Sequence, residues 1–189
     1  MLAVCFGAAA YGQVHISTSR TSLVLDASEG QKLMMLYYGD RLSEDDVRNL
    51  KAAGAFNAEA YPAYGMSGAS ETALAVTHSD GNMSTDLIVD NVEISDKDGG
   101  KLAKICLKDK VYPFYVNVCY RTYPDSEVIE TWSEIENREK KPVVLTEFYS
   151  GFLPLRRGDV WISHLYGSWA NEAKLAQEPL MPGMKVIKN

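Results

Sequence analysis

The stretch of sequence that decides the fold is Tyr112-Pro-Phe-Tyr-Val-Asn-Val-Cys-Tyr-Arg-Thr-Tyr123. Its apolar residues recur with a period of two, as they do along a β-strand that buries one face. One face would carry Phe114, Val116, Val118 and Tyr120, and the opposite face Tyr115, Asn117, Cys119 and Arg121. The pattern therefore predicts a long strand that contributes one side to an apolar core.

Similar runs lie on both sides of this stretch. A turn at Pro124-Asp125-Ser126 leads into a predicted strand at 127–137. Further strands are predicted at 14–19, 22–25, 33–38, 73–78, 85–95, 102–107, 143–152 and 160–165. Turn-forming residues such as Asp98-Gly99-Gly100 separate them. A series of about ten short strands predicts a mainly β fold, an antiparallel sandwich without βαβ units.

One helix is predicted, at 43–53. Ser43 is a suitable N-cap, and the acidic residues that follow it suit the positive end of a helix dipole. Gly54 can end the helix, and its apolar face would carry Val47, Leu50 and Ala53. Because Asp46 lies in the first turn, capping explains the pair Asp45-Asp46 better than a catalytic carboxylate pair does.

The composition describes an acidic globular domain. The chain has 189 residues, 46% of them hydrophobic, and a formal net charge of −6. These values exclude a disordered chain and a disulfide-dense miniprotein. The sequence has no basic run of the kind that binds phosphate backbones, so we expect no nucleic-acid partner.

The N-terminus is uncharged. Ten of the residues in 1–13 are hydrophobic, too few to span a bilayer, so we expect no membrane segment here. Small residues at Ala8-Ala9-Ala10 suit cleavage by a signal peptidase. We expect 1–13 to be the remnant of a signal peptide of a periplasmic or secreted bacterial protein, and 14–189 to be the domain. A hydrophobic N-terminal strand is the alternative, because no basic residue precedes the run.

The common catalytic and metal-binding motifs are missing. His15, His78 and His164 are far apart in the sequence, and no Cys-x-x-Cys spacing occurs, so we expect no metal site and no cofactor. The segment Asp96 to Gly100 has only part of a calcium-loop pattern, and a hairpin turn explains it better. Cys106 and Cys119 would remain after signal cleavage, and we expect them not to form a disulfide.

The segment from His164 to Glu172 reads HLYGSWANE and is rich in aromatic residues. A Trp and a Glu beside a Gly could line a sugar site, because flat aromatic faces stack on pyranose rings. The alternative is a structural corner that seats an aromatic ring in a domain interface.

An ordered series of motifs resembles the N-terminal domain of the glycoside hydrolase family 36 α-galactosidases. The motifs lie at Leu36–Gly39, Tyr61–Gly65, Glu71–Leu74, Thr77–Asn82, Thr85–Leu87, Leu107–Asp109, Val116–Tyr120, Val128–Ile129, Ile135–Asn137 and Leu165–Glu172. Together they extend over roughly residues 14 to 187 in the family's order. The resemblance implies a galactose-mutarotase-like β-supersandwich, which we expect to be incomplete at its C-terminal end.

The resemblance also implies a function. Members of the family hydrolyse terminal α-D-galactosyl residues of raffinose-type oligosaccharides and galactomannan, with retention, and their catalytic carboxylates lie in a following barrel. Lys97-Asp98 and Lys108-Asp109 lie in predicted turns and do not match the family's nucleophile segment. We therefore expect no catalytic residue in this chain. The implied partners are the enzyme's own C-terminal catalytic barrel, α-galactoside oligosaccharides bound by the whole enzyme, and a homo-oligomer.

The candidate site residues divide into two sets. Those expected near substrate are Asp46, Arg48, Tyr64 and Trp169. Those expected to hold structural motifs are Tyr38, Gly39, Tyr61, Gly65, Asp80, Gly81, Asn137, Gly167, Trp169 and Glu172. The stretch Gly65 to Glu71 lacks the Asp-aromatic-Arg element of many relatives, which weakens the case for a substrate contact there. The alternative function is an autonomous carbohydrate-binding or structural module, suggested by Trp132, Trp161, Trp169 and Tyr166.

Overall fold

The computed structural model describes residues 12–54, 56–68, 71–155, 158–181, 183 and 185–187. Most of the expected signal remnant at 1–13 lies outside these residues. The chain divides into two compact units, Met1–Pro154 and Leu155–Asn189, which are described separately below.

The first sheet of the larger unit has four antiparallel strands in the order β1-β2-β3-β4. The strands are β1 (Gln13–Ser17), β2 (Thr21–Asp26), β3 (Met34–Asp40) and the very short β4 (Ala58–Glu59). β4 has only two residues, and the sequence pattern did not indicate it.

The second sheet is a four-stranded antiparallel meander with longer strands. It consists of β6 (Leu87–Lys97), β7 (Gly100–Asp109), β8 (Phe114–Thr122) and β9 (Ile129–Asn137). Asp98 and Gly99 form the two-residue turn between β6 and β7, both with positive φ, as a type I′ hairpin turn requires. The hairpin predicted at Asp96 to Gly100 is therefore confirmed.

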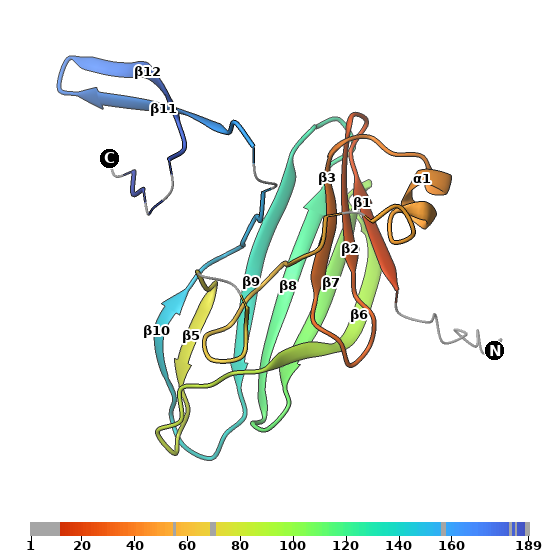
Figure 1. The fold of residues 1–189 in the computed structure, drawn as a ribbon, viewed down its shortest axis with the longest axis vertical. Coiled ribbons are helices and arrows are strands. Elements are labelled where there is room, and N and C mark those ends of the chain that lie inside the picture. The colour runs from red at the N-terminus through yellow and green to blue at the C-terminus, as the bar shows by residue number, and fades with distance from the viewer. Residues whose placement is uncertain are drawn as a thin grey trace. The chain divides into compact units, whose positions relative to one another are not determined.

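The core lies between these two sheets, which face each other (Figure 1). Phe114, Val116 and Val118 of β8 are fully buried against residues such as Ile16 and Leu25. The face predicted from the alternation in β8 is thus the buried one. The described residues form an antiparallel β-sandwich with one short helix, which confirms the predicted mainly β fold class.

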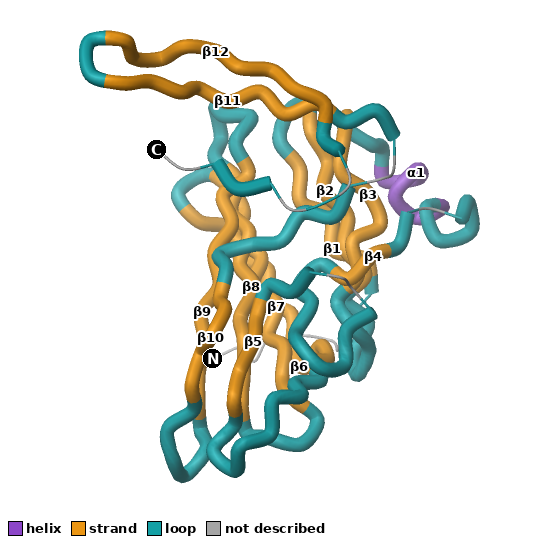
Figure 2. The backbone as a smooth tube through the Cα atoms, turned by 60° about the vertical axis from the view of Figure 1, so that its left-hand side comes forward, coloured by secondary structure: helices purple, strands orange, loops and turns teal. Residues whose placement is uncertain are grey.

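The remaining elements of this unit are a helix and a small strand pair. α1 (Glu44–Asn49) packs Val47 against Val24 and Leu36, and turns continue beyond it to Gly54. The helix is therefore shorter than the expected 43–53. β5 (Leu74–Thr77) pairs with β10 (Val144–Phe148), and Figures 1 and 2 show this pair away from α1.

The smaller unit contains a hairpin of β11 (Trp161–Ser168) and β12 (Asn171–Pro179). The sequence pattern predicted β11 but not β12, whose residues are mostly polar and exposed. Within the described residues, no helix is long and apolar enough to cross a membrane.

Candidate functional site

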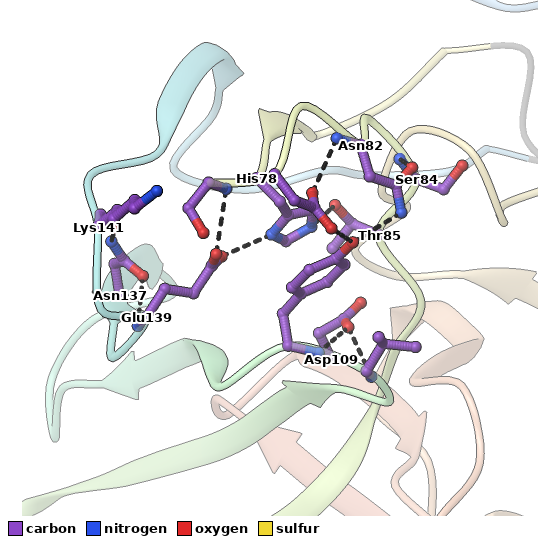
Figure 3. Close-up of polar contacts among 12 residues, drawn as sticks. His78, Asn82, Ser84, Thr85, Asp109, Asn137, Glu139 and Lys141 are labelled. Atoms are coloured by element: carbon purple, nitrogen blue, oxygen red, sulfur yellow. Dashed lines mark hydrogen bonds and ion pairs between the residues drawn. The ribbon is translucent and has the colours of Figure 1, made fainter.

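A buried polar cluster centres on His78, which follows β5. Nδ1 of His78 lies 2.8 Å from Oε1 of Glu139, in the loop after β9, and Nε2 lies 3.0 Å from Oγ1 of Thr85 (Figure 3). The backbone N–H of Ser79 donates to the second carboxylate oxygen of Glu139 at 3.1 Å. Burial alone would raise the pKa of Glu139, but these hydrogen bonds hold it below its usual range.

Ring contacts and further hydrogen bonds fix the imidazole of His78. The ring of Tyr112 stacks on His78 with 3.7 Å between centroids, and Phe114 meets it edge-on. The hydroxyl of Tyr112 donates to Asp80 at 2.8 Å and accepts from the amide of Asn82 at 3.0 Å. The N–H of Asn82 and the hydroxyl of Tyr112 hold the pKa of Asp80 below its usual range. Asp80 thus orders the turn that follows His78.

Hydrogen bonds of the backbone connect this cluster to a neighbouring groove and position it. The amide oxygen of Asn82 accepts from the N–H of Ser84, and the N–H of Thr85 donates to the carbonyl of Tyr64 at 3.0 Å. Gly65 has a φ of +104°, and a Cβ there would lie 2.5 Å from Cα of Ser84. Only glycine allows the two segments to approach this closely.

The groove has a volume of about 610 Å³. Its lining residues are polar apart from the ring of Tyr64 and the backbone of Gly65, namely Ser67, Glu71, Thr72, Ser84 and Glu147. Tyr64 is 50% exposed, and the hydroxyl of Thr72 donates to Glu147 at 3.2 Å. A half-exposed aromatic ring beside hydroxyls and carboxylates has the chemistry to bind a sugar.

Asp46 and Arg48 do not belong to this groove. Both lie on α1, which contacts β1 on another part of the unit (Figure 1). Asp46 closes a capping box with Ser43, and these hydrogen bonds lower the pKa of Asp46. Arg48 forms an ion pair with Asp45. The structure therefore assigns Asp46 the capping role that its position in the sequence indicated.

The other predicted motif residues occupy structural positions. Tyr61 is buried, and its hydroxyl donates to the carbonyl of Tyr149 at 3.0 Å. Gly39 leaves room for the ring of Tyr37. Asn137 caps the loop that carries Glu139, since its side-chain oxygen accepts from the N–H of Glu139 at 2.9 Å.

The remaining motif residues were Tyr38, Gly81, Gly167, Trp169 and Glu172. Tyr38 is half-exposed on β3, and Gly81 has positive φ in the turn after His78. Gly167 interrupts the register of the β11–β12 hairpin, where a Cβ would lie 2.9 Å from Cα of Glu172. Trp169, at the tip of the hairpin, is 95% exposed.

The two described cysteines have free thiols. Cys106 pairs in register with Asn117, and Cys119 pairs with Lys104, so the cysteines are diagonal neighbours on one face. Diagonal positions are about 7–8 Å apart, which is too far for a disulfide. Among the described residues, no group of three His, Cys, Asp or Glu side chains could hold a metal ion.

Sequence reasoning missed the partners of His78 and most of the groove. The signal for the first is the motif Thr77–Asn82, which contains His78 and to which the sequence alone assigns only a family resemblance. Glu139 lies in the charged run Arg138-Glu139-Lys140-Lys141, a composition typical of a solvated loop, for which no prediction is made from the sequence. Glu147 gave no signal, because it reaches the groove only through the pairing of β10 with β5.

Several solved structures with a similar fold are α-galactosidases. A variant of the GH36 α-galactosidase AgaA from Geobacillus stearothermophilus, in complex with raffinose, aligns with a TM-score of 0.79 and 21% identity over 90% of this chain. The α-galactosidase from Lactobacillus brevis aligns with a TM-score of 0.77 and 20% identity over 92% of this chain. The galactosidase domain of the α-galactosidase-sucrose kinase AgaSK aligns with a TM-score of 0.77 and 22% identity over 92% of this chain. The chain spans 28% of the length of each of these proteins.

The sequence itself gives the family. A search of curated proteins yields no match. The family model of the glycosyl hydrolase family 36 N-terminal domain matches residues 31–189, which is most of the chain. The chain therefore belongs to the family of glycosyl hydrolase family 36 N-terminal domains.

Proposed function

We propose that this chain is the N-terminal, non-catalytic portion of an α-galactosidase that hydrolyses terminal α-D-galactosyl residues of raffinose-type oligosaccharides and galactomannan. Its role is to support the catalytic barrel and the oligomer. The family membership and the likeness to α-galactosidases, one of them in complex with raffinose, support this proposal.

The observation that carries the supporting role is the apolar surface of the β11–β12 hairpin. Leu165 and Leu175 face each other across the two strands and are both exposed, as is Trp161 at one end. Trp169 at the tip is almost fully exposed. An isolated two-stranded hairpin is marginally stable in water, and an exposed apolar surface of this kind is typical of an interface. We infer that the barrel or a second copy covers it.

An enzyme assay tests the proposal. The chain alone should not hydrolyse an aryl α-galactoside, whereas a longer polypeptide that continues into the barrel should. Turnover by the chain alone at a rate typical of glycosidases would refute the non-catalytic role. In the longer polypeptide, Leu165→Ser with Leu175→Ser should shift the mass in light scattering towards the monomer or weaken the barrel's thermal stability. Unchanged values of both would refute the supporting role.

The second candidate is an autonomous carbohydrate-binding module. The exposed rings of Trp161, Tyr166 and Trp169 favour it, because such rings can stack on sugars. Calorimetric titration of the chain with galactose, raffinose and galactomannan distinguishes the candidates. If the chain gives heat of sugar binding, and Trp169→Ala and Trp161→Ala abolish it, the binding module is favoured.

A further inference from the structure

The outer face of the β6–β9 sheet, opposite the core, contains a polar hollow of about 300 Å³. Its base is formed by Cys106 of β7 and Asn117 of β8, which are register partners. The neighbours of these residues on the same face are longer, with Lys104 and Lys108 on β7 and Tyr115 on β8. Two short side chains among long ones leave the hollow.

A β-bulge shapes one wall. Val89 pairs with Leu107 and Asn91 with Cys106, so Asp90 is the extra residue on β6. Both Asp90 and Asn91 consequently line the hollow. Bulges redirect side chains in this way and are frequent beside binding sites.

The cations around the hollow are paired with carboxylates. Lys108 contacts Asp90 at 2.5 Å, Lys104 contacts Glu134 at 2.7 Å, and Arg138 contacts Glu136 at 2.7 Å. Arg138 also lies over the ring of Tyr115, 4.4 Å from its centroid. Each cation has an anionic partner, and Glu93, which also lines the hollow, adds a carboxylate that accepts from the side-chain amide of Asn91 at 3.1 Å. The hollow therefore has no excess positive charge for a phosphate or another anionic ligand. It offers hydrogen-bond donors and acceptors to a neutral one.

Asn117 is placed to make such a bond. Its amide nitrogen donates to Glu134 at 3.2 Å, which fixes the side chain, and no described residue donates to its Oδ1. Trp132 lies on the same face and donates from Nε1 to Glu134 at 3.3 Å. The volume is at the lower end of the roughly 300–1,000 Å³ of small-molecule sites, so it suits one ring and not a long chain.

We propose that this hollow binds one neutral sugar residue, with the Oδ1 of Asn117 accepting from a sugar hydroxyl and the thiol of Cys106 beneath the ring. The choice of a terminal α-galactosyl residue as the ligand rests on the proposed function. The binding itself does not, because it needs no catalytic barrel.

Titration of the whole chain with raffinose tests the site. Asn117→Ala should weaken binding about five- to tenfold, the effect of losing one hydrogen bond to a neutral partner. The control is Val111→Ala, which shortens a side chain that is 78% exposed and does not line the hollow, and which should leave the affinity unchanged. Equal affinity of Asn117→Ala and the unaltered chain would overturn the proposal, as would the absence of binding.

Alkylation of Cys106 provides a second measurement that does not depend on a variant. Burial raises the pKa of this thiol, so labelling with N-ethylmaleimide is followed at mildly alkaline pH by mass spectrometry of the Cys106 peptide. Saturating raffinose should slow the labelling severalfold, whereas sucrose, which lacks the galactosyl residue, should not. An unchanged labelling rate in bound protein would overturn the site.

The two proposals can fail separately. Binding with no hydrolysis by the longer polypeptide would leave the site standing and refute the proposed function. Hydrolysis by the longer polypeptide with no raffinose binding by this chain would refute the site and leave the proposed function standing.

Discussion

Nδ1 of His78 lies 2.8 Å from a carboxylate oxygen of Glu139, 61 residues away, and both side chains are withdrawn from solvent, with 0% and 4% exposed. The pair ties the loop after β9 to the turn after β5. Through Thr85, whose hydroxyl contacts the imidazole and whose N–H binds Tyr64, the pair also supports the groove.

Replacement of Glu139 should therefore destabilise the larger unit. Glu139→Ala leaves the N–H of Ser79 and Nδ1 of His78 without their partner in a buried setting. We expect the free energy of unfolding to fall by about 2–4 kcal/mol, as when one member of a buried polar pair is removed. Urea denaturation followed by circular dichroism measures the loss.

The control for this measurement is Glu136→Ala. Glu136 also forms an ion pair, with Arg138, but both side chains are about half exposed. Exposed ion pairs contribute little to stability, so the loss should be much smaller than for Glu139→Ala. Equal losses would show that burial of the His78–Glu139 pair has no energetic consequence.

The same pair predicts an effect of acid. Because the folded pKa of Glu139 lies below the ordinary value of 4.5, its contribution is fully present above that value and is lost as the pH falls through the folded pKa. The unaltered chain should lose stability below about pH 4.5. Glu139→Gln should lose less over the same interval, so the two unfolding free energies should converge. If the free energies of unfolding of the unaltered chain and of Glu139→Gln stayed parallel from pH 7 to pH 3, the lowered pKa of Glu139 would be contradicted.

Most of the sandwich could be predicted from local pattern. The alternation in 112–123 identified the buried face of β8 because that strand borders the core on one side only. Ser43 and the acidic residues after it located the start of α1, since a capping box is encoded within four residues. β12 was missed because an exposed hairpin strand needs no alternation of apolar and polar residues.

The site was less predictable because its contacts join distant segments. His78 and Glu139 come from different loops, and a Glu in a charged run gives no sign that it is buried. Groove residues such as Thr72, Ser84 and Glu147 meet only after β5 has paired with β10. Local pattern contains no information on such pairings.

Gly65, which lines the groove, should tolerate no larger residue. Gly65→Ala places a methyl group 2.5 Å from Cα of Ser84 on a backbone with φ of +104°, so steric overlap adds to backbone strain. We expect a loss of about 2 kcal/mol or more in thermal or urea unfolding. Gly30→Ala, with φ of +73° and open space around it, should cost only about 1 kcal/mol. If Gly65→Ala were as stable as Gly30→Ala, the backbone near Ser84 would have to move and accommodate the methyl group at little cost.

Asp46 allows capping to be separated from substrate contact. The hydroxyl of Ser43 accepts from the N–H of Asp46 at 3.2 Å, and the carboxylate of Asp46 accepts from the N–H of Ser43 at 3.3 Å. Ser43→Ala should lower the free energy of unfolding by about 1 kcal/mol, and Asp46→Ala should also destabilise α1. If Asp46 acts only as a cap, Ser43→Ala and Asp46→Ala should both have the same small effect on KM for raffinose in a polypeptide that includes the barrel. A rise in KM confined to Asp46→Ala would instead assign this carboxylate to substrate.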